Sequence, residues 1–77
     1  MTLEEARNAI DAYQNEHKLT KAFLFNVLSN SLIGAIGSAD KDSIKILPDI
    51  TKYVWNRLPS NIWGSPEKVA DHLNARK

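Results

Sequence analysis

The first part of the chain carries an apolar stripe with helical spacing. One face of an α-helix is formed, at intervals of three or four residues, by Leu3, Ala6, Ile10, Tyr13 and His17. Thr2 and Glu5 stand at the spacing of a capping box, in which each side chain bonds the backbone N–H of the other residue. We therefore predict a first helix over residues 3–17.

The second segment is apolar around most of its helical circumference. Its apolar positions are Phe23, Leu24, Phe25, Val27, Leu28, Leu32, Ile33, Ala35 and Ile36. A helix with this pattern is buried on several sides. We predict one central helix over residues 20–37, capped by Thr20, with Leu28 and Leu32 in the core. The uncharged run 22–39 approaches the length of a membrane span, but polar residues interrupt its middle, so we expect no membrane segment.

Prolines and a serine cap mark the remaining helices. Pro48 disfavours helical geometry at the residue before it, which predicts a third helix over 48–58 that Pro59 ends. Ser65 followed by Pro66 is an N-cap with proline at the first helical position, which predicts a last helix over 65–75. The pattern predicts an all-α fold, a small four-helix bundle in a single domain over residues 1–77. The segment 38–47 is expected to be a turn or a short helical stub.

Composition narrows the class of protein. The 77 residues are 43% hydrophobic and 25% charged, which are ordinary values for a globular domain. The absence of cysteine excludes a disulfide framework, a thiolate nucleophile and cysteine-based zinc sites, and it fits the cytoplasmic location that we expect. The net charge is +1, and the lysines are spread singly among acidic residues rather than gathered in a basic cluster.

The sequence offers no catalytic constellation. His17 and His72 fall near helix ends, and Asp71 points about 100° away from its neighbour His72 on a helix. No serine lies in a glycine-flanked elbow of the kind that activates a nucleophile. We expect a protein that is not an enzyme and that uses no cofactor.

No metal site is expected either. The segment 40–43 begins like a calcium loop, but Ile44 occupies the position of the third ligand, and the required glycine and final glutamate are absent. Asp40 or Asp42 is better explained as a helix cap.

Residues 19–37, "LTKAFLFNVLSNSLIGAIG", resemble the opening of a repressor-type helix-turn-helix, in which Leu-Thr starts the first helix. The resemblance implies a DNA-binding regulator, which is our alternative function. The segment "SNSLIGAIG" would be the recognition helix, and it contains no arginine, lysine or glutamine to reach base edges or phosphates. Nucleic acid is therefore a weakly supported partner.

The two tryptophans indicate a protein-binding surface. Trp63 precedes Gly64 and is expected to hold the last helix against the core, whereas Trp55 lies on the flank of the helix 48–58. Exposed tryptophan, tyrosine and arginine dominate the energetics of interfaces. We predict that the partner-binding residues are Lys52, Tyr53, Trp55 and Arg57. The predicted function is a non-catalytic interaction, assembly or accessory factor that binds another protein or itself; phage or mobile-element inhibitors, immunity proteins and assembly proteins share this composition.

Overall fold

Every regular element in the described part of the chain is helical. The computed structural model describes residues 1–18 and 20–75. Its elements are α1 (Leu3–Glu16), α2 (Ala22–Leu28), α3 (Leu32–Ser38), α4 (Lys41–Arg57), the 3-10 helix η1 (Ser60–Ile62) and α5 (Pro66–Asn74). The all-α prediction is confirmed, but the described chain forms five α-helices where four were predicted.

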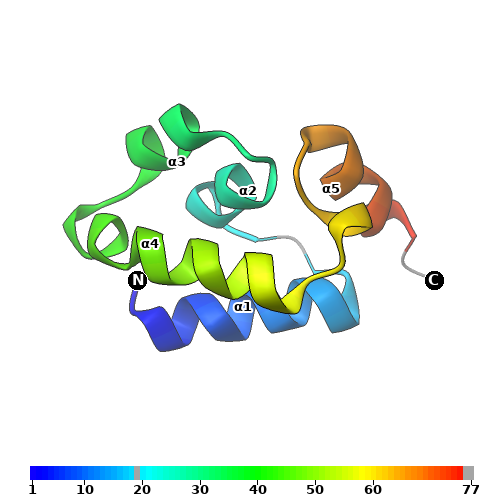
Figure 1. Ribbon diagram of the computed structural model, residues 1–77, viewed down its shortest axis with the longest axis horizontal. Helices are drawn as coiled ribbons and strands as arrows, with labels where there is room; N and C mark the ends of the chain where they lie inside the picture. The colour runs from blue at the N-terminus through cyan, green and yellow to red at the C-terminus, as the bar shows by residue number, and fades with distance from the viewer. Residues whose placement is uncertain (19, 76–77) are drawn as a thin grey trace.

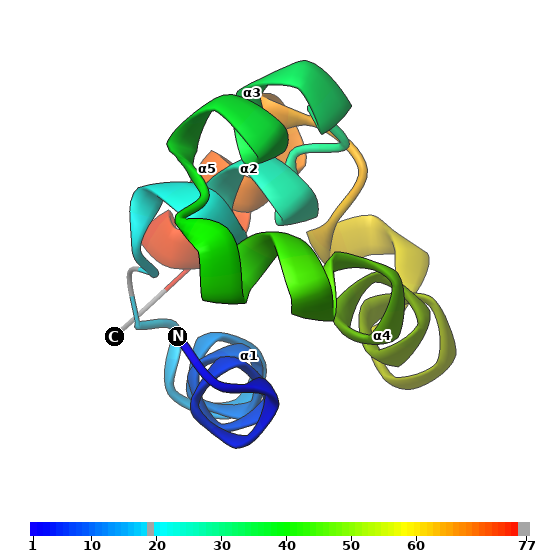
Figure 2. The same cartoon turned by 90° about the vertical axis from the view of Figure 1, so that its left-hand side faces the viewer.

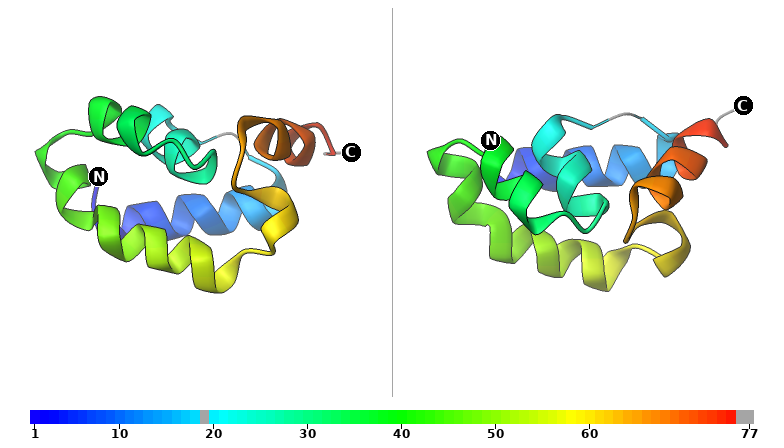
Figure 3. Two further views of the ribbon diagram at one scale, coloured as in Figure 1. Left: turned by 45° about the horizontal axis from the view of Figure 1, so that its top comes forward. Right: turned by 90° about the horizontal axis from the view of Figure 1, so that it is seen from above.

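The helices form two layers. α1 and α4 run side by side in the same direction, and α2, α3 and α5 lie over them (Figures 1 and 2). Seen from above, α2 lies over the space between α1 and α4, while η1 and α5 cover one end of the pair (Figure 3). The principal dimensions are 35 × 22 × 20 Å. A small chain folded in this way has one core, enclosed between the layers.

Helix α1 begins with the predicted capping box. The Thr2 hydroxyl accepts the Glu5 N–H at 3.1 Å, and the Thr2 N–H donates to the Glu5 carboxylate at 2.8 Å. This second bond lowers the pKa of Glu5. The helix ends at Glu16, one residue earlier than predicted, because His17 adopts the left-handed conformation with φ 55°.

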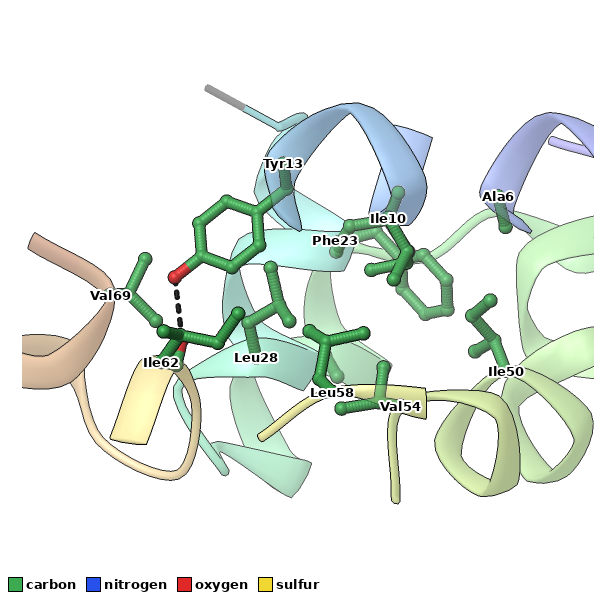
Figure 4. Close-up of a cluster of buried hydrophobic side chains, with 12 residues drawn as sticks. Ala6, Ile10, Tyr13, Phe23, Leu28, Ile50, Val54, Leu58, Ile62 and Val69 are labelled. Atoms are coloured by element: carbon green, nitrogen blue, oxygen red, sulfur yellow. Dashed lines mark hydrogen bonds between the residues drawn. The ribbon is translucent and has the colours of Figure 1, made fainter. Parts of the chain in front are cut away.

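The core joins both layers and the end turn. Its buried residues are Ala6, Ile10, Tyr13, Phe23, Leu24, Leu28, Ala35, Ile50, Val54, Leu58, Ile62 and Val69. Tyr13 is the largest fully buried side chain, and its hydroxyl donates a hydrogen bond of 2.6 Å to the Ile62 carbonyl (Figure 4). Burial raises the pKa of Tyr13 to about 12. The bond holds η1 against α1.

The two histidines cap each other's helices. His17 Nδ1 lies 2.8 Å from the His72 carbonyl oxygen, and His72 Nε2 lies 2.7 Å from the Tyr13 carbonyl oxygen. Because a carbonyl only accepts, each of these ring nitrogens carries a hydrogen. The rings stack with centroids 4.1 Å apart. These bonds add a side-chain donor to carbonyls near the C-terminal ends of α1 and α5; the Tyr13 carbonyl also accepts the backbone N–H of His17 at 3.1 Å.

The predicted single helix over 20–37 is wrong. α2 ends at Leu28 and α3 begins at Leu32, with Asn30 between them in the left-handed conformation at φ 62°. Asparagine tolerates this conformation, and serine and asparagine side chains compete for backbone hydrogen bonds. The cap of α2 is Lys21 rather than Thr20. Leu19, which opens the helix-turn-helix resemblance, lies outside the described residues.

The break lets α3 fold back onto α2. Gly34 faces α2 so closely that a Cβ there would lie 2.7 Å from the Asn26 carboxamide oxygen. The Asn26 amide donates to the Ser38 hydroxyl at 3.1 Å, which ties the other end of α3 to the same side chain. α3 consequently buries only Ala35, and Leu32 is 65% exposed instead of lying in the core.

The predicted helix start at Pro48 is also wrong. α4 begins at Lys41, where the Asp40 carboxylate caps it by accepting the Ser43 N–H at 2.8 Å; this bond lowers the pKa of Asp40. Pro48 lies inside the helix and offers no N–H to the Ile44 carbonyl. Both residues are exposed, on the side of α4 away from the core. The helix bends in its first half (Figure 2), as expected for an interior proline. The predicted capping role is confirmed for Asp40.

The C-terminal helix agrees with its sequence signals. α4 ends at Arg57 ahead of Pro59, and α5 begins at Pro66 with the Ser65 hydroxyl accepting the Lys68 N–H at 3.2 Å. The connection between them was predicted to be a loop, and the 3-10 helix η1 within it was not predicted. There Gly64 has φ 111° and its N–H donates to the Leu28 carbonyl at 2.7 Å, which closes the C-terminal end of α2.

The break in the second helix predicts opposite effects for two leucines. Leu28 is fully buried, so Leu28→Ala should lower the free energy of unfolding by about 2–5 kcal/mol. Leu32→Ala should change it by less than about 0.5 kcal/mol, because this side chain is largely exposed. Urea unfolding followed by circular dichroism measures both values. Equal and large losses would mean that residues 20–37 form one buried helix after all.

Removal of the Tyr13 hydroxyl should destabilise the fold and change its response to alkali. Tyr13→Phe leaves the Ile62 carbonyl buried without its donor, which costs about 1–3 kcal/mol. Because the folded pKa of about 12 exceeds the ordinary value of 10, the wild type should lose stability as pH rises from 10 to 12. The variant should lack that part of the loss. Thermal unfolding of the two proteins across this pH range measures the difference; Tyr53, whose pKa is also raised, is present in both, so its contribution cancels.

Candidate functional site

Helix α4 separates the residues predicted to bind a partner. Trp55 lies on the side of α4 that faces α3, where it lines an apolar groove. Lys52, Tyr53 and Arg57 instead line a shallow hollow on the α1 side. The structure therefore divides the four residues between two surfaces.

The hollow is organised around Tyr53. Its hydroxyl donates to the Asp11 carboxylate at 2.6 Å, and the guanidinium carbons of Arg7 and Arg57 lie 5.5 and 5.2 Å from the ring centroid. The hydrogen bond to Asp11, and after it burial, raises the pKa of Tyr53. The half-buried ring thus links α1 to α4, and the charges gathered around it have opposite signs.

The groove lies between α3 and α4. α3 packs principally on α2 and leaves the adjoining side of α4 uncovered. The groove is lined by Val27, Asn30, Ser31, Leu32, Ala35, Leu47, Thr51, Val54, Trp55 and Trp63, and its volume is about 110 Å³. None of these residues is charged. An engineered apolar cavity of about 150 Å³ holds benzene, so this space is suited to a single aliphatic side chain.

The two tryptophans stand together at the groove. Their ring centroids are 5.8 Å apart in an edge-to-face arrangement, a favourable geometry for aromatic pairs. Trp63 is half-buried and packs against the core, whereas Trp55 is 71% exposed. The Trp63 indole N–H is buried and finds no acceptor within the described residues. Packing against Trp55 and the core, rather than a hydrogen bond, therefore orients this ring.

Exposed apolar side chains continue the groove along both helices. The exposed large hydrophobic residues of the described chain are Leu32, Ile33, Ile36, Ile44 and Trp55. Helical geometry places Leu32 and Ile36 on one face of α3, and Ile44 and Trp55 on the same flank of α4. We call these five residues the apolar face. The sequence analysis missed all of it except Trp55, because it placed residues 32–36 in the core and residue 44 in a separate stub.

Comparisons with known proteins supply no functional information. No protein-family model matches the chain, and neither the curated proteins nor the solved structures contain a match. Over residues 1–18 and 20–75, no helix has both the length and the apolar character needed to cross a bilayer. The function must be inferred from the chemistry of the groove, which is apolar, uncharged and open to a partner.

The two tryptophans should differ in fluorescence. With Trp63 replaced by phenylalanine, Trp55 should emit at the long wavelength of a hydrated indole and be quenched readily by acrylamide, because most of its surface is exposed. With Trp55 replaced by phenylalanine, Trp63 should emit at shorter wavelength and be quenched more slowly. The spectra are to be recorded at nanomolar concentration, so that no association covers the groove. A short-wavelength, protected Trp55 under these conditions would place it in the core.

Proposed function

We propose that this protein is a non-catalytic interaction module that binds an apolar segment of a protein through the groove between α3 and α4. The observation that carries the proposal is the uncharged lining of the groove together with the 71% exposure of Trp55 beside it. Tryptophan is enriched among the residues that dominate interface energies. The cytoplasm is the proposed location.

The energetics of the apolar face support this function. A large apolar side chain has an accessible surface of roughly 200 Å². With the exposed fractions of the five residues, the apolar face leaves roughly 600 Å² of surface in contact with water. The largest apolar patch of a typical monomer is about 300–600 Å², and patches at the upper end of that range often mark interaction sites. α3 itself buries little, so its apolar residues contribute little to folding. A partner that buried these side chains would give them a role in binding, whereas they have little role in folding.

DNA binding is the second candidate. The order of α2, a three-residue turn and α3 matches a helix-turn-helix in its connection, and the turn falls within the segment that resembles one. The exposed large side chains of α3 are, however, isoleucine and leucine, which offer no hydrogen bonds to base edges. We therefore favour a protein partner. A mobility shift of mixed-sequence DNA at low salt that disappears with Ile33→Glu would favour the DNA function instead.

The proposed function predicts position-dependent photo-crosslinking. A benzophenone amino acid in place of Thr51, an exposed residue that lines the groove, should form covalent adducts with protein when the chain is expressed in cells and irradiated. The same substitution at Ala70, exposed on α5, is the matched control and should form few.

The contribution of Trp55 is tested in the same cells. Adding Trp55→Ala should remove most of the Thr51 adduct, because truncating a central tryptophan costs more than about 2 kcal/mol of binding. Circular dichroism must show that this variant is still folded. Equal adduct yields from Thr51 and Ala70, or a Thr51 adduct whose yield Trp55→Ala does not lower, would contradict binding in the groove.

A further inference from the structure

We infer that the occupant of the groove is a second copy of this chain, related to the first by a two-fold axis. This inference rests on the proposed function, because it names the partner for the same groove. Each copy would insert Ile33 from the crest of α3 into the groove between α3 and α4 of the other. Three observations point to a second copy.

The first observation is the absence of charge from the apolar face and the groove. A two-fold interface brings the same patch of both subunits together, so any charge near the axis would meet a like charge. No lining residue of the groove is charged, and α3 has no charged residue at all. Helical geometry places Lys41, Lys45 and Lys52 on the outer surface of α4, where Lys41 and Lys52 border Ile44 and Trp55 at the edge of the apolar face. The groove and α3 themselves carry no charge that would meet a like charge at a two-fold axis.

The second observation is that α3 carries both a projecting side chain and one wall of the hollow. Ile33 is 87% exposed on α3, and Leu32, which points about 100° away from it around the helix, forms part of the groove wall. In a two-fold interface, residue i of the first copy contacts residue j of the second, and residue j of the first contacts residue i of the second. A surface that carries both a projection and a hollow can satisfy this requirement. The volume of about 110 Å³ is suited to one aliphatic side chain of the size of Ile33.

The third observation is the area. Burying the apolar face of both copies would remove roughly 1,200 Å² from water, which is the lower limit of specific interfaces of standard size. Weak and transient complexes have interfaces at the low end of the size range, so we expect a dimer that dissociates on dilution. A larger protein partner would need further contact area outside the apolar face, where the surface of α4 is charged.

Sedimentation equilibrium tests the inference on the intact chain. The weight-average mass should rise from that of a monomer toward that of a dimer between about 1 μM and 1 mM, and Ile33→Asp should weaken association at least tenfold. Ile33 is so exposed that this substitution should leave the melting temperature of the monomer unchanged. Ala70→Asp introduces the same charge on α5 and should associate like the wild type.

Disulfide trapping tests the contact itself, since the chain has no cysteine of its own. Mild oxidation of an equimolar mixture of Ile33→Cys and Thr51→Cys should give a crosslinked heterodimer. Its yield should exceed that from a mixture of Ile33→Cys with Ala70→Cys, which places the second thiol away from the groove.

The outcomes separate this inference from the proposed function. A wild type that stays monomeric up to 1 mM overturns the second copy; if the Thr51 photo-adducts then contain another protein, the groove still binds protein. If the chain is monomeric and no protein adduct forms, both proposals fail. A dimer that Ile33→Asp does not weaken, or that yields no preferential Ile33–Thr51 crosslink, has another interface and also overturns the inference. Flotation with lipid vesicles by a strictly monomeric chain would assign the apolar face to a membrane surface instead.

Discussion

The fold depends on a tyrosine that is buried together with its hydrogen bond. A chain of this size has few large side chains with which to fill a core, and Tyr13 is the largest that is fully buried. Its ring can lie there because the hydroxyl donates to the Ile62 carbonyl. A phenol buried without a partner would be destabilising, and the carbonyl would be left unsatisfied as well. This one bond connects α1 to η1 and fixes where the chain turns between α4 and α5.

The reciprocal histidine bonds act at the same end of the molecule. The Tyr13 carbonyl accepts from His72, so the residue whose side chain holds η1 uses its backbone to hold α5. The stacked ring of His17 completes the arrangement through the His72 carbonyl. With these groups satisfied, a helix of only nine residues can dock on the core. At the other end of the molecule, α3 and α4 are joined by the short connection Ala39–Asp40 (Figure 1).

The groove is a consequence of how α3 is held. Gly34 and the Asn26–Ser38 hydrogen bond fix α3 on α2, and only Ala35 turns toward the core. The remaining apolar residues of α3 then face outward or toward α4, and the gap beside them is lined by side chains that also belong to the core, such as Val54. Core and groove share this wall. A partner in the groove would therefore contact the same helix face that packs the interior, which couples binding to the stability of the fold.

Local signals in the sequence determined the helical class and the starts of α1 and α5, and they narrowed the helix cap in the segment 40–43 to Asp40 or Asp42. Each of these depends on residues within a few positions of one another, as in the capping box of Thr2 and Glu5 or the Ser65–Pro66 pair. Helical geometry also placed Trp55 on the flank of its helix. Its 71% exposure, and its separation from Lys52, Tyr53 and Arg57, with which it was predicted to share one binding surface, came only from the tertiary structure.

Tertiary structure decided the rest. The apolar residues of 32–36 have the composition of a core, but the turn at Asn30 and the close approach at Gly34 place most of them on the surface. The helix through Pro48 persists because Ile50 and Val54 are buried against other helices, which offsets a penalty that the sequence alone predicts to be decisive. Hydrophobic periodicity shows which residues favour burial. Whether each of them is buried depends on how the short helices pack against one another, and in this fold no other helix covers the outer side of α3 over the described residues.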